Sequence, residues 1–97
     1  MNARKAMPFD IRHDPDARRF LIEVEGHVGH VDYARTGETL AIIHTIVPPE
    51  IGGRGIAAAL VRAAVEHARA EGLKIDPQCS YADVWLQRHP EYAGLRA

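Results

Sequence analysis

Apolar residues recur at every second position in the first half of the chain, which is typical of β-strands with one buried face. Between residues 18 and 25, Phe20, Ile22 and Val24 alternate with mostly polar neighbours, and residues 27–33 alternate in the same way. Turn residues separate these stretches, so the pattern predicts an antiparallel meander.

Two further strands are expected in this half. Residues 9–13 predict a short strand that ends at the turn Asp14-Pro-Asp. Residues 40–47 are apolar at successive positions, as in a central strand that is covered on both faces.

The spacing of apolar residues changes in the second half of the chain. Residues 54–71 follow the period of a helix, and Gly72 is placed to end it. A short strand is expected over residues 73–75. The spacing Ser80-x-x-Asp83 resembles a capping box and predicts a second helix, which ends near His89-Pro90.

The predicted order β-β-β-β-α-β-α indicates an α+β fold with a mixed sheet. Its strand-helix-strand part requires two parallel strands joined by a right-handed crossover. The C-terminal ends of residues 40–47 and 73–77 should therefore lie side by side. We expect Cys79 and His44 to lie close together at that edge.

Residues 46–57 join a strand to a helix through two prolines and a loop with glycines at 52, 53 and 55. The first N–H groups of a helix have no intrahelical partner, so such a loop is suited to binding an anion. A Walker-type loop is excluded because its Lys and hydroxyl residues are absent. A dinucleotide fingerprint, Gly53-x-Gly55-x-x-Ala58 with Asp76, remains an alternative.

The segment Val47-Pro-Pro-Glu50 followed by Gly52-Gly-Arg-Gly-Ile-Ala57 resembles the acetyl-coenzyme A pyrophosphate loop of the GNAT-type N-acetyltransferases. Gly55 and Ala57 match the last two fixed positions of that motif. Gly52 stands at the first fixed position, where the family has Gln or Arg. One side-chain anchor of the family is therefore missing.

Three more segments are similar to the small, stand-alone YjdJ-like branch of this superfamily. They are His44-Thr-Ile-Val-Pro-Pro-Glu50, Pro77-Gln-Cys79 and Arg88-His-Pro-Glu-Tyr92, in that order. Ile46 stands where the branch usually has Glu. The resemblance spans residues 20–92 and implies a GNAT-like sheet, with residues 9–97 forming one acetyltransferase domain. Residues 1–8 are expected to be a flexible N-terminus, as chain ends often are.

The resemblance implies an N-acetyltransferase that uses acetyl-coenzyme A as co-substrate. The residues it places at the cofactor are Ile46, Val47, Gly52, Gly53, Arg54, Gly55, Ile56 and Ala57. The acceptor is an amine, either a small molecule, a peptide or a protein. A non-catalytic protein that binds coenzyme A or acyl-coenzyme A is the alternative from another class.

Three residues are candidates for catalysis. Cys79 is either an acetyl carrier, a proton donor to the coenzyme A thiolate, or a small buried apolar residue. His44 is either a general base, a partner of Cys79, or a histidine satisfied by hydrogen bonds within the sheet. Tyr81 is either an acid, as in many larger members of the family, or an aromatic anchor of the core.

Composition narrows the partners and the compartment. A formal net charge of -1 without blocks of like charge argues against nucleic acid or a membrane surface as the main partner. The single cysteine excludes an internal disulfide and favours a reducing compartment, which we take to be the cytoplasm. The histidines are scattered, so we expect no metal site.

Overall fold

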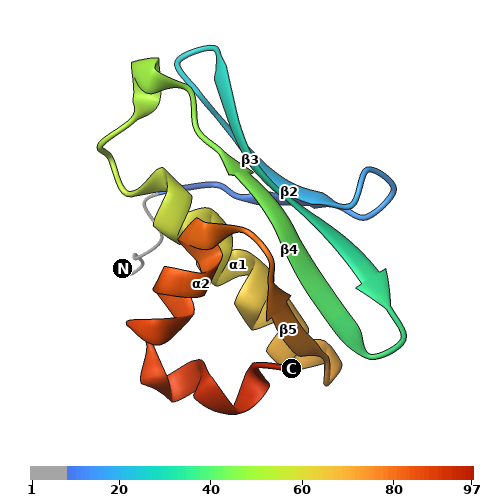
Figure 1. The fold of residues 1–97 in the computed structure, drawn as a ribbon. Helices are drawn as coiled ribbons and strands as arrows, with labels where there is room; N and C mark the ends of the chain where they lie inside the picture. Colours follow the sequence, from blue (N-terminus) through green and yellow to red (C-terminus); the bar gives the residue numbers. More distant parts are fainter. Residues whose placement is uncertain (1–8) are drawn as a thin grey trace, which may run out of the picture.

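Five strands form one mixed sheet in the part of the chain that the structure, a computed structural model, describes: residues 9–97 (Figure 1). They lie in sequence order: β1 (Arg12–Asp14), β2 (Arg19–Val24), β3 (His27–Thr36), β4 (Thr39–Ile46) and β5 (Lys74–Pro77). Neighbours from β1 to β4 are antiparallel, and β5 is parallel to β4. The predicted α+β mixed sheet is confirmed. The prediction for residues 1–8 lies outside the described residues.

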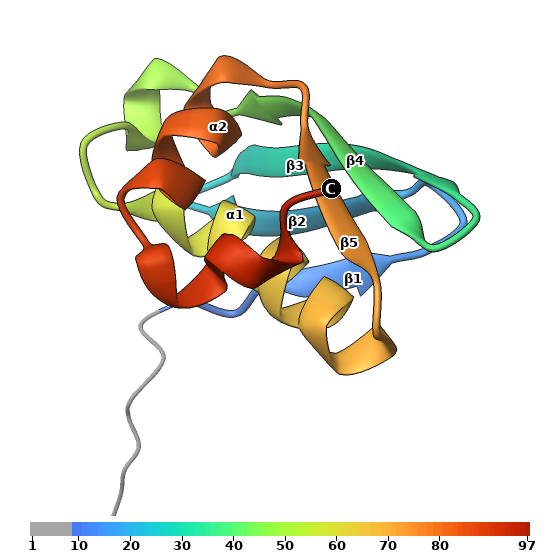
Figure 2. The same cartoon turned by 60° about the horizontal axis from the view of Figure 1, so that its bottom comes forward.

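Two helices, α1 (Ile56–Glu71) and α2 (Ser80–Gln87), cover the same face of the sheet (Figure 2). The 3-10 helices η2 (Pro49–Ile51) and η3 (Pro90–Leu95) precede α1 and follow α2, and the sequence pattern did not predict either of them. The chain then returns to the sheet beside β5, where the N–H of Ala97 donates to the carbonyl of Ile75 at 2.8 Å.

The hydrophobic core lies between the helices and this face of the sheet. Its strand residues alternate along each strand with residues of the other face, as the period-2 pattern predicts. The buried residues of the sheet and helices are Phe20, Ile22, Val31, Tyr33, Leu40, Ile42, Ile56, Leu60, Val61, Ala64, Val65, Ala68, Ile75, Ala82, Trp85 and Leu86.

Gly29 of β3 allows the first turn of α1 to rest closely on the sheet. A Cβ atom at this position would lie 3.3 Å from Cγ2 of Ile56 and 3.6 Å from Cδ1 of Leu60. The glycine therefore sets how near the N-terminus of α1, and with it the glycine loop, lies to the sheet.

No helix covers the second face of the sheet among residues 9–97, and we call this the open face (Figure 2). Ala41 and Ile43 are only half-buried there. The prediction that residues 40–47 are covered on both faces is therefore wrong. The apolar run cannot reveal this, because a buried strand and a half-exposed strand with alanine and isoleucine on the outside look alike.

β4 is irregular at Ile43. Asp32 pairs with His44 and the next residue, Tyr33, pairs with Ile42, so Ile43 is an extra residue that forms a β-bulge. The pairing of β4 with β5 ends at Ile42 and Pro77, whereas β4 continues to Ile46. Residues 43–46 therefore border an opening in the sheet, which we call the β4–β5 gap.

Candidate active site

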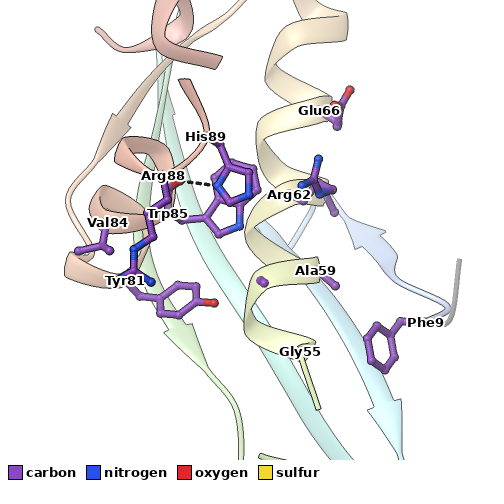
Figure 3. Close-up of a pocket in the computed structure, with 12 residues that line it drawn as sticks. Phe9, Gly55, Ala59, Arg62, Glu66, Tyr81, Val84, Trp85, Arg88 and His89 are labelled. Carbon is purple, nitrogen blue, oxygen red and sulfur yellow. Dashed lines mark hydrogen bonds between the residues drawn. The ribbon is translucent and has the colours of Figure 1, made fainter. Parts of the chain in front are cut away.

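A groove of about 670 Å³ runs between α1 and α2. Figure 3 shows that it begins near Gly55 and Tyr81 and extends along both helices towards Glu66 and His89. Its walls are mostly apolar. The residues that line it are Phe9, Gly55, Ala58, Ala59, Arg62, Ala63, Glu66, Tyr81, Val84, Trp85, Arg88 and His89.

The N-terminus of α1 opens into this groove without a side-chain cap. Gly55 is the N-cap residue and has φ +82°, a left-handed conformation that glycine adopts at no steric cost. The helix begins at Ile56, two residues later than the pattern predicts. The N–H groups of its first turn, at residues 56–58, have no intrahelical partner and lie at the positive end of the helix dipole.

Arg54 is engaged by an acidic residue from the turn after β2. Its guanidinium forms two hydrogen bonds with the carboxylate of Glu25, at 2.9 and 3.1 Å. The hydrogen bond and the charge of Arg54 lower the pKa of Glu25. The side chain predicted to touch a phosphate therefore already has an anionic partner.

The other residues predicted at the cofactor differ in their exposure and in whether their N–H groups are free to bind a ligand. The N–H of Gly52 donates to the carbonyl of Pro49 at 3.1 Å, so it is not free to bind an anion. Val47 packs against the core, whereas Ile46 ends β4 on the open face with 48% of its surface exposed. Gly53, with φ +73°, is exposed in the loop before the helix.

Cys79 is the N-cap residue of α2 and lies beside the β4–β5 gap. Its Sγ atom is 3.5 Å from Oγ1 of Thr45, and its own N–H donates to the carbonyl of Ile42. Burial raises the pKa of the thiol, but hydrogen bonds from the N–H of Ala82, the Thr45 hydroxyl and the N–H of Tyr81 outweigh it, so the pKa is lowered. This favours the thiolate.

The spacing from Ser80 to Asp83 does not form the capping box that the sequence indicates. Cys79, the residue before this pair, takes the N-cap position instead. The Asp83 carboxylate instead accepts hydrogen bonds from Arg96 at 2.9 Å and Gln87 at 3.3 Å. The residue at the start of α2 that lies nearest the helix N–H groups is therefore Cys79 and not Ser80.

Tyr81 lies in the first turn of α2 and lines the groove opposite Gly55 (Figure 3). Its side chain is 42% exposed, so it does not anchor the core. Burial of the phenol raises its pKa, which keeps the hydroxyl protonated and able to donate a proton.

His44 does not lie with Cys79. It is paired with Asp32 in the sheet, while the next residue, Thr45, is paired with the fully buried Val31. Opposite residues of an antiparallel pair share a face, so Thr45 points to the helices and His44 to the open face. The predicted contact between His44 and Cys79 is therefore wrong, because neighbouring side chains of a strand point to opposite faces.

Sequence reasoning missed the far end of the groove. The indole of Trp85 stacks on the ring of His89 at 3.8 Å, and the Arg62 guanidinium lies 5.2 Å from the indole. Tyr92 receives a hydrogen bond from Arg62 and donates one to Glu66. The helical spacing of these residues was visible in the sequence, but the packing of η3 against α1 was not.

The sequence profile of the GCN5-related N-acetyltransferases matches residues 19–95. The chain belongs to this family. It is accordingly an enzyme of the transferase class. The dinucleotide alternative falls because, among the strands of residues 9–97, only β4 and β5 are parallel neighbours. The match is to the family as a whole, so membership of the YjdJ-like branch stays a prediction.

Curated relatives and a solved structure agree with this assignment. The N-acetyltransferase is 33% identical over 86 residues to Protein NATD1 from Gallus gallus, covering 86% of this chain and 78% of that protein. Protein NATD1 from Homo sapiens is also 33% identical over 86 residues, and the match covers 86% of this chain and 76% of that protein. A GCN5-like protein from Staphylococcus aureus, solved by NMR, superposes with a TM-score of 0.73 at 30% identity, over 92% of this chain and 88% of that one.

Two further observations concern residues 9–97 only. No helix in this range is long and apolar enough to cross a membrane. Nor do its His, Cys, Asp and Glu side chains gather into a group of three that could hold a metal ion.

Proposed function

We propose that this N-acetyltransferase uses acetyl-coenzyme A and transfers the acetyl group to an amine. The observation that carries the proposal is the groove between α1 and α2, which begins at the uncapped N-terminus of α1. A pyrophosphate at this helix N-terminus would leave one part of a large ligand to lie in the mostly apolar groove and let the other part extend towards the adjoining β4–β5 gap.

The pyrophosphate would be held by main-chain N–H groups. Those of residues 56–58 point out of the first turn of α1, and Gly55 has no Cβ atom to obstruct an approach. The Arg54 guanidinium is paired with Glu25 and would add little. Gly53 lies in the same loop. Binding in this mode depends on the backbone rather than on a particular side chain.

The thioester end would lie at the β4–β5 gap. There β4 has free edge groups over residues 43–46, because β5 has already left the sheet. Cys79 borders the gap, and Tyr81 lines the adjoining wall of the groove. Cys79 serves either as the acetyl carrier or as the proton donor to the departing thiolate, and Tyr81 is the second candidate donor.

An amine that attacks the thioester must first be neutral, so a group nearby must accept a proton. His44 is the histidine of β4 and lies in the part that borders the gap, and imidazole is a common general base in enzymes. Because it faces away from Cys79, it would act on an amine that approaches from the open face. The acceptor stays open among small amines, peptides and proteins.

We also propose the cytoplasm as the location, since one cysteine suits a reducing compartment.

Calorimetric titration with acetyl-coenzyme A tests the groove. We expect Gly55→Val to weaken binding at least tenfold, because a β-branched side chain would occupy the open space before the helix N-terminus and disfavours a positive φ. Gly37→Val is the matched control, since Gly37 also has a positive φ and open space around it but lies in the turn between β3 and β4. Equal affinity in the Gly55 and Gly37 variants would contradict the proposed loop.

Release of coenzyme A with a panel of amines separates catalysis from binding alone. We expect release above the uncatalysed rate with at least one amine, and a loss of turnover in Cys79→Ala. Intact-mass measurement after incubation with acetyl-coenzyme A distinguishes the two roles of the thiol, because only a carrier retains an acetyl group. A protein that binds the ligand but turns over no amine would be a coenzyme A binder without activity.

A further inference from the structure

A cluster of polar side chains lies on the open face and has no part in the groove. At its centre is Asp32 of β3, whose carboxylate accepts hydrogen bonds from Arg19 Nε at 3.0 Å and His30 Nδ1 at 2.9 Å. The three side chains are 19 to 37% exposed, so they are half-buried on a face that no described helix covers. Such an arrangement holds the imidazole in one orientation.

The register of the sheet places this cluster beside His44. Asp32 pairs with Arg19 of β2 on one side and with His44 of β4 on the other. Opposite residues in an antiparallel pair have Cβ atoms about 4.5–5.5 Å apart. Two imidazoles therefore flank one carboxylate, with His30 on the same strand and His44 on the next.

The cluster adjoins the β4–β5 gap. β4 is the last strand before the gap, and His30 is paired with Ile46 at its end. At residues 43–46 the side chains of β4 alternate between the open face, with His44, and the side on which Thr45 contacts Cys79 at 3.5 Å. Because β5 pairs with β4 only as far as Ile42, His44 lies at the part of β4 where that strand no longer has β5 beside it.

We infer that the acceptor amine approaches from the open face. We infer also that His30, oriented by Asp32, is a second base beside His44, so that either imidazole can accept the proton of the amine. This inference rests on the proposed function and adds the direction of approach and a second base. With Nδ1–H donated to Asp32, Nε2 of His30 is free to accept a proton. The arrangement is that of a base and its orienting carboxylate.

The proton balance is complete with these groups. The ammonium form of the acceptor gives one proton to an imidazole, which leaves a neutral amine and an imidazolium beside Asp32. The amine nitrogen then forms a bond to the carbonyl carbon as the carbon–sulfur bond breaks. The second amine proton passes to the departing thiolate, directly or through Cys79 or Tyr81, and the imidazolium returns its proton to solvent.

The surroundings of the cluster favour an amine carried on an apolar chain. Val28 and Ile46 are 42% and 48% exposed on the open face, next to His30 in the sheet. They offer contact to methylene groups such as those of a lysine side chain, while the imidazoles receive its nitrogen.

Turnover of two probe amines tests the inference. A peptide with a single lysine is protonated at neutral pH, since the lysine pKa is about 10.4, whereas hydroxylamine is largely neutral. We expect His30→Ala to lower turnover of the peptide by about 100-fold, and of hydroxylamine much less, because general-base assistance is typically worth about 10² to 10⁴. Added imidazole should restore part of the lost activity.

Matched variants separate this role from a structural one. Asp32→Asn should lower turnover of the peptide, and His67→Ala, a histidine on the helix side outside the groove, should not. His30→Gln keeps the size of the side chain if His30→Ala is unstable. Unchanged turnover in the His30 and Asp32 variants would overturn the inference while leaving acetyl-coenzyme A binding intact. Failure of the unaltered protein to bind acetyl-coenzyme A would instead overturn the proposed function, and the inference with it.

Discussion

The Cys79 thiol shows how one residue's environment follows from its place in the fold. It is the N-cap residue of α2, and it also reaches Thr45 across the β4–β5 gap. The helix end supplies N–H groups, and the strand supplies a hydroxyl. Neither interaction alone distinguishes a reactive cysteine from a small buried one, but together they lower its pKa despite burial.

We predict that Thr45→Val slows alkylation of Cys79 at neutral pH. Loss of the hydroxyl removes one of the hydrogen bonds that stabilise the thiolate, so the pKa rises and the thiolate fraction at pH 7 falls. The rate of reaction with iodoacetamide against pH measures this as a midpoint that moves upward. Thr39→Val, on the same strand but at its other end, serves as the control and should leave the midpoint unchanged.

For the histidines, the face of the sheet on which a side chain lies decides its possible role. His44 follows Ile43, an extra residue in β4, and the pairing of Thr45 with Val31 decides which way each side chain points. The sequence shows which residues carry imidazoles but not which face they occupy. The face determines whether a base can meet the thiol or only a substrate that comes from the open side.

At the scale of elements, the turn after β2 meets the start of α1 through Glu25 and Arg54. This contact limits what the arginine can contribute to an anion in the loop. We predict that Arg54→Ala changes the affinity for acetyl-coenzyme A less than about threefold, because surface charges contribute little once paired. Glu25→Gln should tighten binding, since it frees the guanidinium for the pyrophosphate.

Calorimetry at low and high salt measures both variants. The gain in Glu25→Gln should shrink at high salt, as expected for an exposed charge. A large loss in Arg54→Ala at low salt would show that the arginine leaves Glu25 to bind the ligand.

The packing of η3 on α1 depends on Tyr92. Its buried hydroxyl donates to Glu66 and accepts from Arg62, and the hydrogen bond from Tyr92 is the main reason that the pKa of Glu66 is lowered. We predict that Tyr92→Phe destabilises the fold by about 1 kcal/mol at pH 7, a modest value because Glu66 is partly exposed.

The pH dependence of this loss has a definite sign. A carboxyl group whose pKa is lowered by folding stabilises the native state above its unfolded pKa, and the stabilisation is lost as the pH falls through the folded value. The difference between Tyr92→Phe and the unaltered protein should therefore shrink at pH 3. Urea unfolding at pH 7 and pH 3 measures it. Tyr81→Phe, whose hydroxyl lies at an exposed groove wall, should show no difference at either pH.

At the scale of the whole molecule, the groove exists because two helices joined through β5 lie on one face of the sheet with small residues between them. Ala59 and Ala63 of α1 face Trp85 and Val84 of α2 across it. Larger side chains at these alanines would close the groove without disturbing the core beneath.

We predict that Ala59→Trp weakens acetyl-coenzyme A binding by at least tenfold and leaves thermal unfolding nearly unchanged. Ala59 lines the groove but is not part of the buried core. Ala70→Trp is the control, because Ala70 is exposed near the C-terminal end of α1, outside the groove. Normal binding in Ala59→Trp would show that the ligand lies elsewhere.

The sequence by itself determined the strands, the helices and their order. Alternation of apolar residues and the position of Gly72 are local signals, and hydrogen bonding along the chain follows from them. The glycine loop before a helix was equally local, so a candidate anion site could be predicted at residues 53–57. The parallel pairing of β4 and β5 followed from the rule for right-handed crossovers.

Only the tertiary structure decided how the candidate residues combine. The bulge at Ile43 and the end of the β4–β5 pairing at Ile42 open the sheet beside Cys79. No residue pattern in the sequence predicts either feature. Contacts between strands separate His44 from Cys79 and place it with Asp32 and His30, which the linear pattern left scattered. The physical reason is that a side chain's face depends on register between strands, and register is set by packing of the whole sheet rather than by any one segment.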